Sequence, residues 1–364
     1  MLPRAQGFFV LLIVAMSSEL RPWPRRLESL LQGHDLTAND ASSLMRAWLA
    51  GDLSPAQTGA FLAGLRAKGI VADELVAMAI VLRKACPLPC DRPDLTMVDT
   101  CGTGGDGADT FNVSTAVAFT TASCGVNVAK HGNRSASGNV GSADVLEGLG
   151  VNLGAPLASV VDAISKTGIT FLFAPAWHSA LVNLAPLRHS LGVRTVFNLL
   201  GPLVNPLQPQ AQVLGVAQAD LLNPMASALS QLHLKRAIVV HGSGGLDEAS
   251  LSGVNELRLI EAGRSIASRF ISPNDLGFEQ VPLEALRGGN LAENQRILEN
   301  VLKGQATPAQ MDVVAFNTAL ALWVAGSESD LKIASRRALQ TLRQGLPWQK
   351  LQDLRQALSH GNGQ

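Results

Sequence analysis

The chain has 364 residues, of which 47% are hydrophobic and 16% are charged, and its 29 Lys and Arg residues balance 29 Asp and Glu residues. This length can build one large domain or two, and the neutral charge excludes a general attraction to nucleic acid or to an anionic membrane. With no Tyr and five Trp, the chain also lacks the material for an aromatic base-stacking surface. We therefore expect no nucleic-acid partner and no membrane partner, and any anion site must be built locally.

The N-terminus carries an apolar run over residues 8–16 that follows Arg4. The run is too short to span a bilayer, and no small-residue cleavage site follows it closely. We interpret residues 1–15 as a disordered or mis-assigned extension, with a short targeting peptide as the alternative. The four cysteines form no Cys-x-x-Cys pair, which is typical of free thiols in a reducing compartment, so we expect the protein in the cytoplasm.

Residues 25–85 predict four consecutive helices. The clearest boundary is the capping box Ser54-Pro55-Ala56-Gln57, with proline at the first helical position, and Gly69 ends the same helix. A proline-rich segment over residues 86–93 then breaks the helical pattern. We expect a helical domain over residues 16–92, completed by residues 176–207, where a second helical stretch interrupts the rest of the chain.

From residue 94 onward, short apolar runs alternate with helical stretches. The predicted strands cover residues 95–98, 126–129, 169–173, 213–216, 237–240 and 256–260, and the predicted helices cover 114–124, 142–150, 157–167, 220–233, 311–324, 329–344 and 347–359. This alternation predicts an α/β fold with a small N-terminal helical domain and a large domain over residues 93–175 and 208–364. The large domain should hold a mainly parallel sheet covered by helices.

The most informative segment joins the first predicted strand to the helix at 114–124. Four glycines fall within six residues there: Gly102, Gly104, Gly105 and Gly107. Glycine permits positive φ and lets a ligand touch the main chain, and backbone N–H groups at such a loop and at the following helix start bind phosphate. A hydroxyl-bearing helix start and a basic strand end follow in order, so we interpret the loop as a site for a phosphorylated ligand.

A dinucleotide site is the first alternative, because Gly102, Gly104 and Gly107 also satisfy the Gly-x-Gly-x-x-Gly pattern. That interpretation needs a carboxylate near the end of the next strand. The next strand ends instead in Lys130-His131-Gly132-Asn133-Arg134, a basic cluster suited to a second phosphate or to a leaving diphosphate. The Walker pattern is absent too, since no Gly-Lys-Ser/Thr follows the loop.

A pair of acids, Asp247 and Glu248, follows the predicted strand at 237–240 within a glycine-rich loop. Strand C-termini in open α/β sheets form the ligand crevice, and carboxylates are the hard oxygen ligands that Mg²⁺ prefers. A solvated acidic loop would be the simpler interpretation of the pair alone. Beside a phosphate loop, a magnesium site is favoured, because Mg²⁺ neutralises diphosphate.

Seven motifs follow one another along the chain: Asp99–Asp106 (Asp-Thr-Cys-Gly-Thr-Gly-Gly-Asp), Asn112–Thr115, Lys130–Arg134, Gly141–Glu147, Phe171–Pro175, Arg194–Pro202 and Gly245–Glu248. Together they resemble the anthranilate phosphoribosyltransferase family, and the resemblance runs in order from about residue 25 to the C-terminus. The resemblance implies transfer of the phosphoribosyl group of 5-phosphoribosyl 1-diphosphate to anthranilate in tryptophan biosynthesis. It further implies Mg²⁺ as cofactor and a homodimer that pairs through the helical domain.

The resemblance also implies roles for individual residues. Lys130, Asp247 and Glu248 would be catalytic, and Ser114, Asp247 and Glu248 would be the metal ligands. Anthranilate would contact Gly102, Asn133 and Arg188, with His131 and His178 along its route. Phosphoribosyl diphosphate would be held by Gly102, Gly105, Asp106, Thr110, Asn112, Val113, Ser114, Thr115, Lys130, His131, Gly132, Asn133, Arg134, Ser135, Ala136, Ser137, Gly138 and Ser142.

The chain departs from the family pattern at Gly138 and Asn139, where many relatives carry a lysine and more hydroxyls. Backbone N–H groups survive both changes, so we expect weaker phosphate binding and not loss of activity. Leu181 replaces a more polar or aromatic residue of some relatives, which leaves anthranilate contacts there open.

Two other functions compete with the transferase. A nucleoside phosphorylase of the same fold would also need a glycine-rich phosphate loop, but it would have no need of an adjacent acid pair for a metal. A non-catalytic relative that binds nucleic acid is disfavoured by the neutral charge and by the intact Asp247-Glu248 pair.

Overall fold

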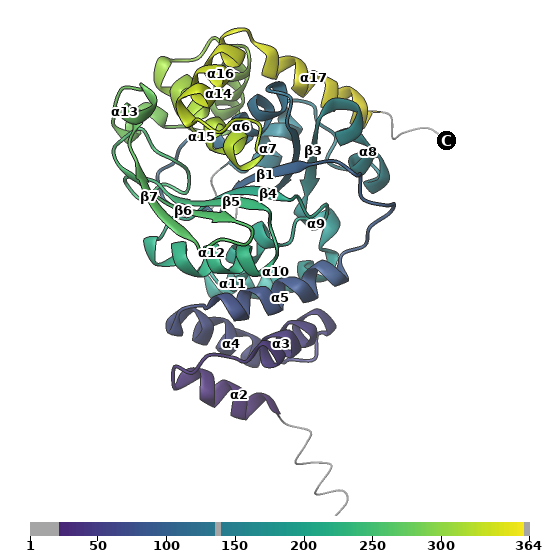
Figure 1. The fold of residues 1–364 in the computed structure, drawn as a ribbon. Coiled ribbons are helices and arrows are strands. Elements are labelled where there is room, and N and C mark those ends of the chain that lie inside the picture. Colours follow the sequence, from purple (N-terminus) through teal and green to yellow (C-terminus); the bar gives the residue numbers. More distant parts are fainter. Residues whose placement is uncertain (1–21, 135–139, 360–364) are drawn as a thin grey trace, which may run out of the picture.

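The computed structural model describes residues 22–134 and 140–359 (Figure 1). The extension expected over residues 1–15 therefore lies outside the described residues. The four predicted N-terminal helices are confirmed as α2 (Pro22–Leu31), α3 (Ala38–Ala50), α4 (Pro55–Lys68) and α5 (Ala72–Ala85). The predicted capping box at Ser54 is present, because its hydroxyl accepts from the Gln57 N–H while the Gln57 side chain accepts from the Ser54 N–H.

A seven-stranded sheet in the order β3-β2-β1-β4-β5-β6-β7 forms the centre of the larger domain. The pairs among β1 to β5 are parallel, and those of β6 and β7 are antiparallel, which confirms the mainly parallel sheet. The strands are β1 (Met97–Gly102), β2 (Asn127–Gly132), β3 (Ile169–Phe173), β4 (Ala211–Gly215), β5 (Arg236–His241), β6 (Asn255–Glu261) and β7 (Ala267–Ile271).

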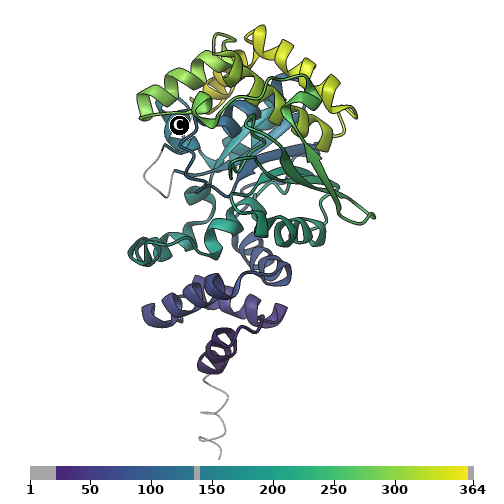
Figure 2. The same ribbon diagram turned by 90° about the vertical axis from the view of Figure 1, so that its left-hand side faces the viewer.

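Helices cover both faces of this sheet (Figures 1 and 2). In Figure 1, α14 to α17 lie above the sheet and α12 lies below it, between the sheet and the helical bundle. The covering helices are α6 (Val113–Ser123), α7 (Ser142–Gly148), α8 (Leu157–Thr167), α12 (Leu222–Gln231), α13 (Pro273–Leu276), α14 (Leu291–Leu302), α15 (Pro308–Val324), α16 (Leu331–Arg343) and α17 (Leu346–Ser359), with short 3₁₀ turns η3 (Ala219–Leu221) and η4 (Leu283–Leu286).

The stretch between β3 and β4 is helical in short pieces, as its sequence predicts. It contains α9 (Ala174–Trp177), η1 (Ser179–Leu184), α10 (Ala185–Leu191), α11 (Val196–Leu200) and η2 (Gly201–Leu203). The stretch packs on the N-terminal bundle, because η1 contacts α3, α10 contacts α4, and α11 contacts α4 and α5. One hydrophobic cluster runs from the bundle through this stretch to one face of the sheet, so the two parts share a core.

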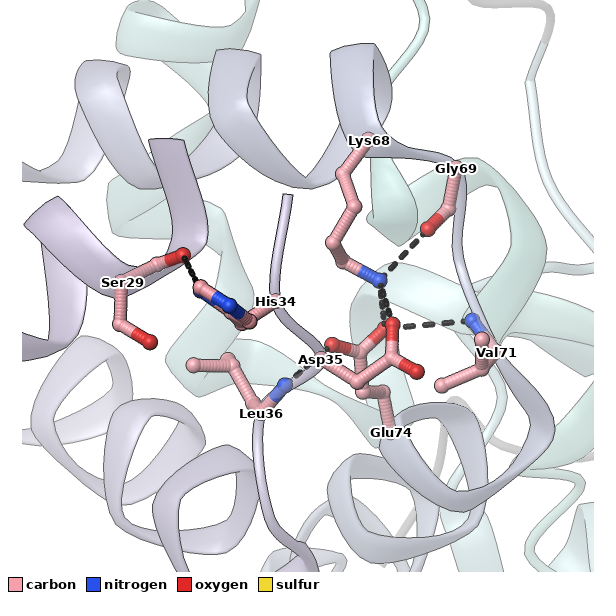
Figure 3. Close-up of polar contacts among 8 residues, drawn as sticks. All are labelled: Ser29, His34, Asp35, Leu36, Lys68, Gly69, Val71 and Glu74. Atoms are coloured by element: carbon pink, nitrogen blue, oxygen red, sulfur yellow. Dashed lines mark hydrogen bonds and ion pairs between the residues drawn. The ribbon is translucent and has the colours of Figure 1, made fainter. Parts of the chain in front are cut away.

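A buried ion pair joins three segments of the bundle (Figure 3). Glu74 is fully buried, and its carboxylate accepts from the Leu36 N–H at 2.8 Å and from Lys68 Nζ and the Val71 N–H at 3.1 Å each. Lys68, 5% exposed, also reaches the exposed carboxylate of Asp35. Glu74 thus ties the α2–α3 loop, the end of α4 and the start of α5 together.

Replacing Glu74 by Ala should lower the free energy of unfolding by about 3–5 kcal/mol, because the Lys68 ammonium loses its buried anionic partner and the Leu36 and Val71 N–H groups lose their acceptor. Asp35→Ala is the matched control: its carboxylate is exposed, and its loss should cost less than about 1 kcal/mol. Urea denaturation followed by circular dichroism measures both variants. Equal losses in the two variants would contradict this account of the bundle.

Candidate active site

The glycine loop, residues 102–112, begins at the end of β1 and leads into α6. Gly104, Gly105 and Gly107 have φ values of 70°, 76° and 71°, a left-handed conformation that side chains other than glycine rarely adopt. The far end of the loop is tied to the segment before α14, since the Phe111 N–H donates to the Leu286 carbonyl at 3.1 Å. The loop therefore has a defined shape with exposed backbone at its glycines.

Three carboxylates meet beside this loop. One oxygen each from Asp106, Asp247 and Glu248 lies within 4.8 Å of the others. The Gly104 N–H donates to Asp247 at 2.6 Å. Burial, and then the neighbouring Asp106, raise the pKa of Asp247 to about 7, and burial followed by Asp247 and Asp106 raises the pKa of Glu248 well above its usual range. Closely spaced, partly buried carboxylate oxygens of this kind repel one another and suit a hard divalent cation.

Ser114, the third expected metal ligand, lies next to these acids. Its backbone N–H donates to Glu248, and its hydroxyl accepts from Lys130. Asp106 was expected only as a phosphoribosyl diphosphate contact, so sequence reasoning missed its place in the acid cluster. The donor set fits a magnesium ion, because every candidate ligand is a carboxylate or hydroxyl oxygen.

Glycines at the ends of β1 and β4 and just after β5 make room for the segment that carries Asp247 and Glu248, which we call the acid loop. A Cβ on Gly215 would stand 1.5 Å from the Asp247 carbonyl oxygen, and one on Gly102 would stand 2.0 Å from Asp247 Oδ2. A Cβ on Gly242 would likewise stand 2.0 Å from the Glu248 carbonyl oxygen. Gly102 thus has a packing role whatever it does for a substrate, and Gly215 and Gly242 are site residues that sequence reasoning missed.

Asn317 holds the acid loop from the other side. It lies in the middle of the buried helix α15 and is 3% exposed. Its Oδ1 accepts from the Ala249 N–H at 2.9 Å, and its Nδ2 donates to the Ala249 carbonyl at 2.8 Å. Both polar groups of the residue after Glu248 are therefore fixed. An amide within an otherwise apolar run was the sequence signal that could have found it.

Lys130 lies at the end of β2 with its ammonium buried near the acids. Its Nζ donates to the Thr100 carbonyl at 2.7 Å and to the Ser114 hydroxyl at 3.1 Å. Burial lowers the pKa of Lys130, while Asp99 and then Glu248 and Asp247 act against that shift. Asp99 is itself buried and hydrogen-bonded to Asn205 and to the His131 N–H, and burial raises its pKa to about 6. A cation is thus held beside the acid cluster.

The two histidines expected along the anthranilate route are neighbours. The rings of His131 and His178 lie 5.3 Å apart, and His131 Nδ1 bonds the Gly201 carbonyl at 3.0 Å. Burial lowers the pKa of His131 to about 3 and that of His178 to about 4, so both are neutral. Neither Nε2 has a hydrogen-bond partner within the described residues, and His131 offers a phosphate no positive charge.

Three further expected contacts lie after β2 and at the start of α7: Asn133, Arg134 and Ser142. Arg134 forms ion pairs with Asp144 at 2.6 Å and Glu147 at 2.8 Å, so its charge is already partnered. The backbone carbonyl of Asn133, the residue after Gly132, accepts from the Ser142 hydroxyl at 3.3 Å. Ser135, Ala136, Ser137 and Gly138 lie outside the described residues, as does Asn139, and their roles stay predictions.

The start of α6 holds four further expected contacts. Asn112 donates through Nδ2 to the Val140 carbonyl at 2.9 Å, while its buried Oδ1 has no partner among the described residues. Thr110 forms a bridge with Arg287, and Val113 and Thr115 are buried in α6. The side chains of Val113 and Thr115 are therefore directed to packing, so a ligand would meet only the backbone at these two positions.

Arg188, the expected anthranilate contact, lies in α10. Its guanidinium stacks over the Phe197 ring at 5.2 Å, and burial lowers its pKa. Within the part of the chain that the structure describes, no hydrogen bond or ion pair involves this side chain. A half-buried guanidinium with free donors suits a carboxylate ligand.

Arg194 belongs to a family motif but was given no role, and the structure places it on the glycine loop. Its Nη2 donates to the Thr103 carbonyl at 2.5 Å. A Cβ on Gly105 would stand 2.0 Å from its Nη1, so the guanidinium lies directly on the Gly105 backbone.

Comparison with known proteins identifies this architecture. A glycosyl transferase family helical bundle domain matches residues 25–86, and a glycosyl transferase family a/b domain matches residues 94–347. The anthranilate phosphoribosyltransferase of Synechococcus sp. (strain CC9902) is 82% identical over 342 residues, which cover 94% of this chain and 97% of that protein. The chain belongs to the anthranilate phosphoribosyltransferase family.

Solved structures of the family have the same fold. The anthranilate phosphoribosyltransferase of Thermus thermophilus is 40% identical with a TM-score of 0.84, covering 91% of this chain and 98% of that chain. The Saccharomyces cerevisiae enzyme in complex with PRPP and Mg is 26% identical with a TM-score of 0.83, covering 92% of this chain and 96% of that chain. Among the described residues, no helix has the length and apolar character needed to cross a membrane.

Proposed function

We propose that this chain transfers the phosphoribosyl group of 5-phosphoribosyl 1-diphosphate to the amine of anthranilate, releasing diphosphate, in the biosynthesis of tryptophan. The observation that carries the proposal is the cluster of Asp106, Asp247 and Glu248, with buried Lys130, beside a glycine loop, in a chain 82% identical to a protein of that name. The nucleoside phosphorylase alternative does not explain the acid cluster.

We propose Mg²⁺ as the cofactor, held by Asp247 and Glu248 together with Ser114 and the newly placed Asp106. When bound, Mg²⁺ supplies positive charge that draws off the negative charge of a departing diphosphate. Support comes from the oxygen-only donor set and from the solved yeast enzyme, which is described with PRPP and Mg.

Groups of the chain itself supply the remaining positive charge and hydrogen-bond donors for the leaving diphosphate. The amine of anthranilate is a weak nucleophile, because its lone pair is shared with the ring, so the sugar carbon must become strongly electrophilic. The ammonium of Lys130 and the exposed N–H groups of the glycine loop stabilise charge on the leaving group. No general base is needed before the C–N bond forms, since the amine loses its proton afterwards.

We propose that Arg188 binds the carboxylate of anthranilate through paired N–H donors, with Gly102 and Asn133 completing the contact. The guanidinium is half-buried, so a charged hydrogen bond is stronger there than in water. The neutral rings of His131 and His178 fit the route of an aromatic acid, because they offer apolar edges without a second positive charge.

Arg188→Ala should raise the apparent KM for anthranilate roughly 10- to 100-fold, the value of one charged hydrogen-bonded pair. The KM for phosphoribosyl diphosphate should change less than about twofold, since Arg188 lies on a different element from the glycine loop. Initial rates, followed through loss of anthranilate fluorescence, measure both constants. His189→Ala, an exposed neighbour in the same helix, is the control, and equal rises in both constants would count against the assignment.

We propose a cytoplasmic homodimer that pairs through the helical domain, residues 16–92 with about 176–207. This proposal rests on the family resemblance, and light scattering after gel filtration tests it by the measured mass. The reaction itself is tested by complementing a tryptophan auxotroph that lacks this step. Growth without tryptophan supports the proposed function, and failure of a well-expressed protein to restore growth contradicts it.

A further inference from the structure

Arg194 lies where the glycine loop meets the helical part of the molecule. It follows α10 and precedes Thr195, the residue at the N-terminus of α11. Its Nη2 donates to the Thr103 carbonyl, and its Nη1 lies on Gly105, 3.8 Å from the place of a Cβ on Gly104. The planar guanidinium therefore covers the part of the loop where consecutive residues adopt positive φ.

The charge of Arg194 faces the acid cluster. Asp247 and Asp106 both act on its guanidinium, in opposition to the burial that lowers its pKa. Arginine stays protonated in such surroundings. A fixed positive charge, with the cationic Arg66 also nearby, therefore lies within electrostatic range of Asp247 and Asp106, two of the three carboxylates.

The backbone of Arg194 is anchored from the helical bundle. Arg66, in α4, donates through Nη1 to the Arg194 carbonyl at 3.2 Å. A continuous path of contacts thus runs from α4 through Arg194 to the loop. Glycines with positive φ lose much conformational freedom when they are ordered, so a contact that holds them in place lowers the cost of presenting their N–H groups to a ligand.

We propose that Arg194 is a positioning residue that clamps the glycine loop in its diphosphate-binding shape and couples that loop to the helical bundle. The diphosphate part of the proposal rests on the proposed function. The clamp itself does not, because it is a property of the substrate-free chain.

Hydrogen exchange of the free protein tests the clamp without any substrate. In Arg194→Ala, the peptide spanning residues 103–107 should exchange about tenfold faster than in the wild type, because the loop loses its clamp. Arg264→Ala, which removes an exposed arginine elsewhere (72% exposed), should leave that peptide unchanged. Exchange of the 103–107 peptide within twofold of wild type in Arg194→Ala would overturn the proposal, whatever reaction the protein catalyses.

Steady-state kinetics test the link to the diphosphate. The apparent KM for phosphoribosyl diphosphate should rise about tenfold in Arg194→Ala while that for anthranilate changes less than about twofold. Arg194→Lys keeps the charge and the stem packing, so it should fold even where the alanine variant does not. It should still show the higher KM, because an ammonium cannot reproduce the planar contact.

Rescue distinguishes a local clamp from a general structural defect. Guanidinium ions at sub-denaturing concentration should lower the raised KM of Arg194→Ala, and ethylammonium ions should not. A wild-type KM for phosphoribosyl diphosphate in Arg194→Lys would overturn the inference, as would equal rescue by both ions. If the wild-type protein does not turn over anthranilate and phosphoribosyl diphosphate, the proposed function is refuted instead. The hydrogen-exchange experiment would still show whether Arg194 clamps the glycine loop.

Discussion

Asp247→Asn should lower kcat at least a hundredfold at saturating substrates, because the proposed magnesium site would lose a charged oxygen ligand and with it the cation that would stabilise the leaving group. Activity of the wild type should disappear with EDTA and return with added Mg²⁺. Glu284→Gln, which neutralises an exposed acid outside the site, is the matched control. Undiminished turnover in Asp247→Asn would remove the metal role from this carboxylate.

The same variant should gain stability in the absence of metal. The folded-state pKa of Asp247 is about 7, above the unfolded value of about 3.9. The folded protein therefore favours the protonated form of this carboxyl. The resulting contribution to stability is fully present below about pH 4 and is lost as pH rises through about 7. In EDTA, the Tm of Asp247→Asn should exceed that of the wild type by more at about pH 8 than at about pH 5. A constant difference would contradict the repulsion inferred here.

Gly215→Ala should abolish most of the activity although residue 215 carries no functional group. Its Cβ would stand 1.5 Å from a backbone oxygen of Asp247, so the acid loop must move as a whole. Misplacing a metal ligand by about 1 Å typically costs on the order of a hundredfold in rate. Magnesium titration of activity should show a weaker apparent affinity for the ion.

Gly201→Ala is the matched control for this substitution, because an added Cβ at Gly201 has no atom within 4 Å and its φ is negative, at −47°. It should retain wild-type kinetics and wild-type magnesium dependence. If Gly215→Ala kept full activity, the acid loop would not need the close approach to β4 that the structure shows.

The parts of the fold that sequence patterns predicted are those with local signals. The capping box at Ser54 and the apolar runs located the bundle helices, α15 and strands β1 to β6. β7 was missed because four of its five residues are exposed, so it has no apolar alternation. α14 was missed although Asn290 and Glu293 form a capping box, a signal that sequence reasoning passed over. β1 also runs to Gly102, beyond its apolar run, because Asp99 to Gly102 pair with β4.

The residues of the candidate site could likewise be predicted only where their signal is local in the sequence. Asp247 and Glu248 were predicted, because two carboxylates after a strand are a local pattern. Gly215, Arg194 and Asn317 were not, because each acts through a partner far along the chain: Arg194 is 91 residues from Thr103, and Asn317 is 68 from Ala249. Their roles depend on which strands are neighbours in the sheet, and β1 next to β4 is set by the whole core.

We infer that the glycine loop, Lys130 and a divalent ion at the acid cluster together bind the diphosphate of phosphoribosyl diphosphate. Isothermal titration of phosphoribosyl diphosphate into the full chain tests it directly. We expect saturable binding at one site per chain in the presence of Mg²⁺, and loss of that binding in EDTA or in Asp247→Asn. Absence of binding heat with Mg²⁺ present, at several temperatures, would contradict it.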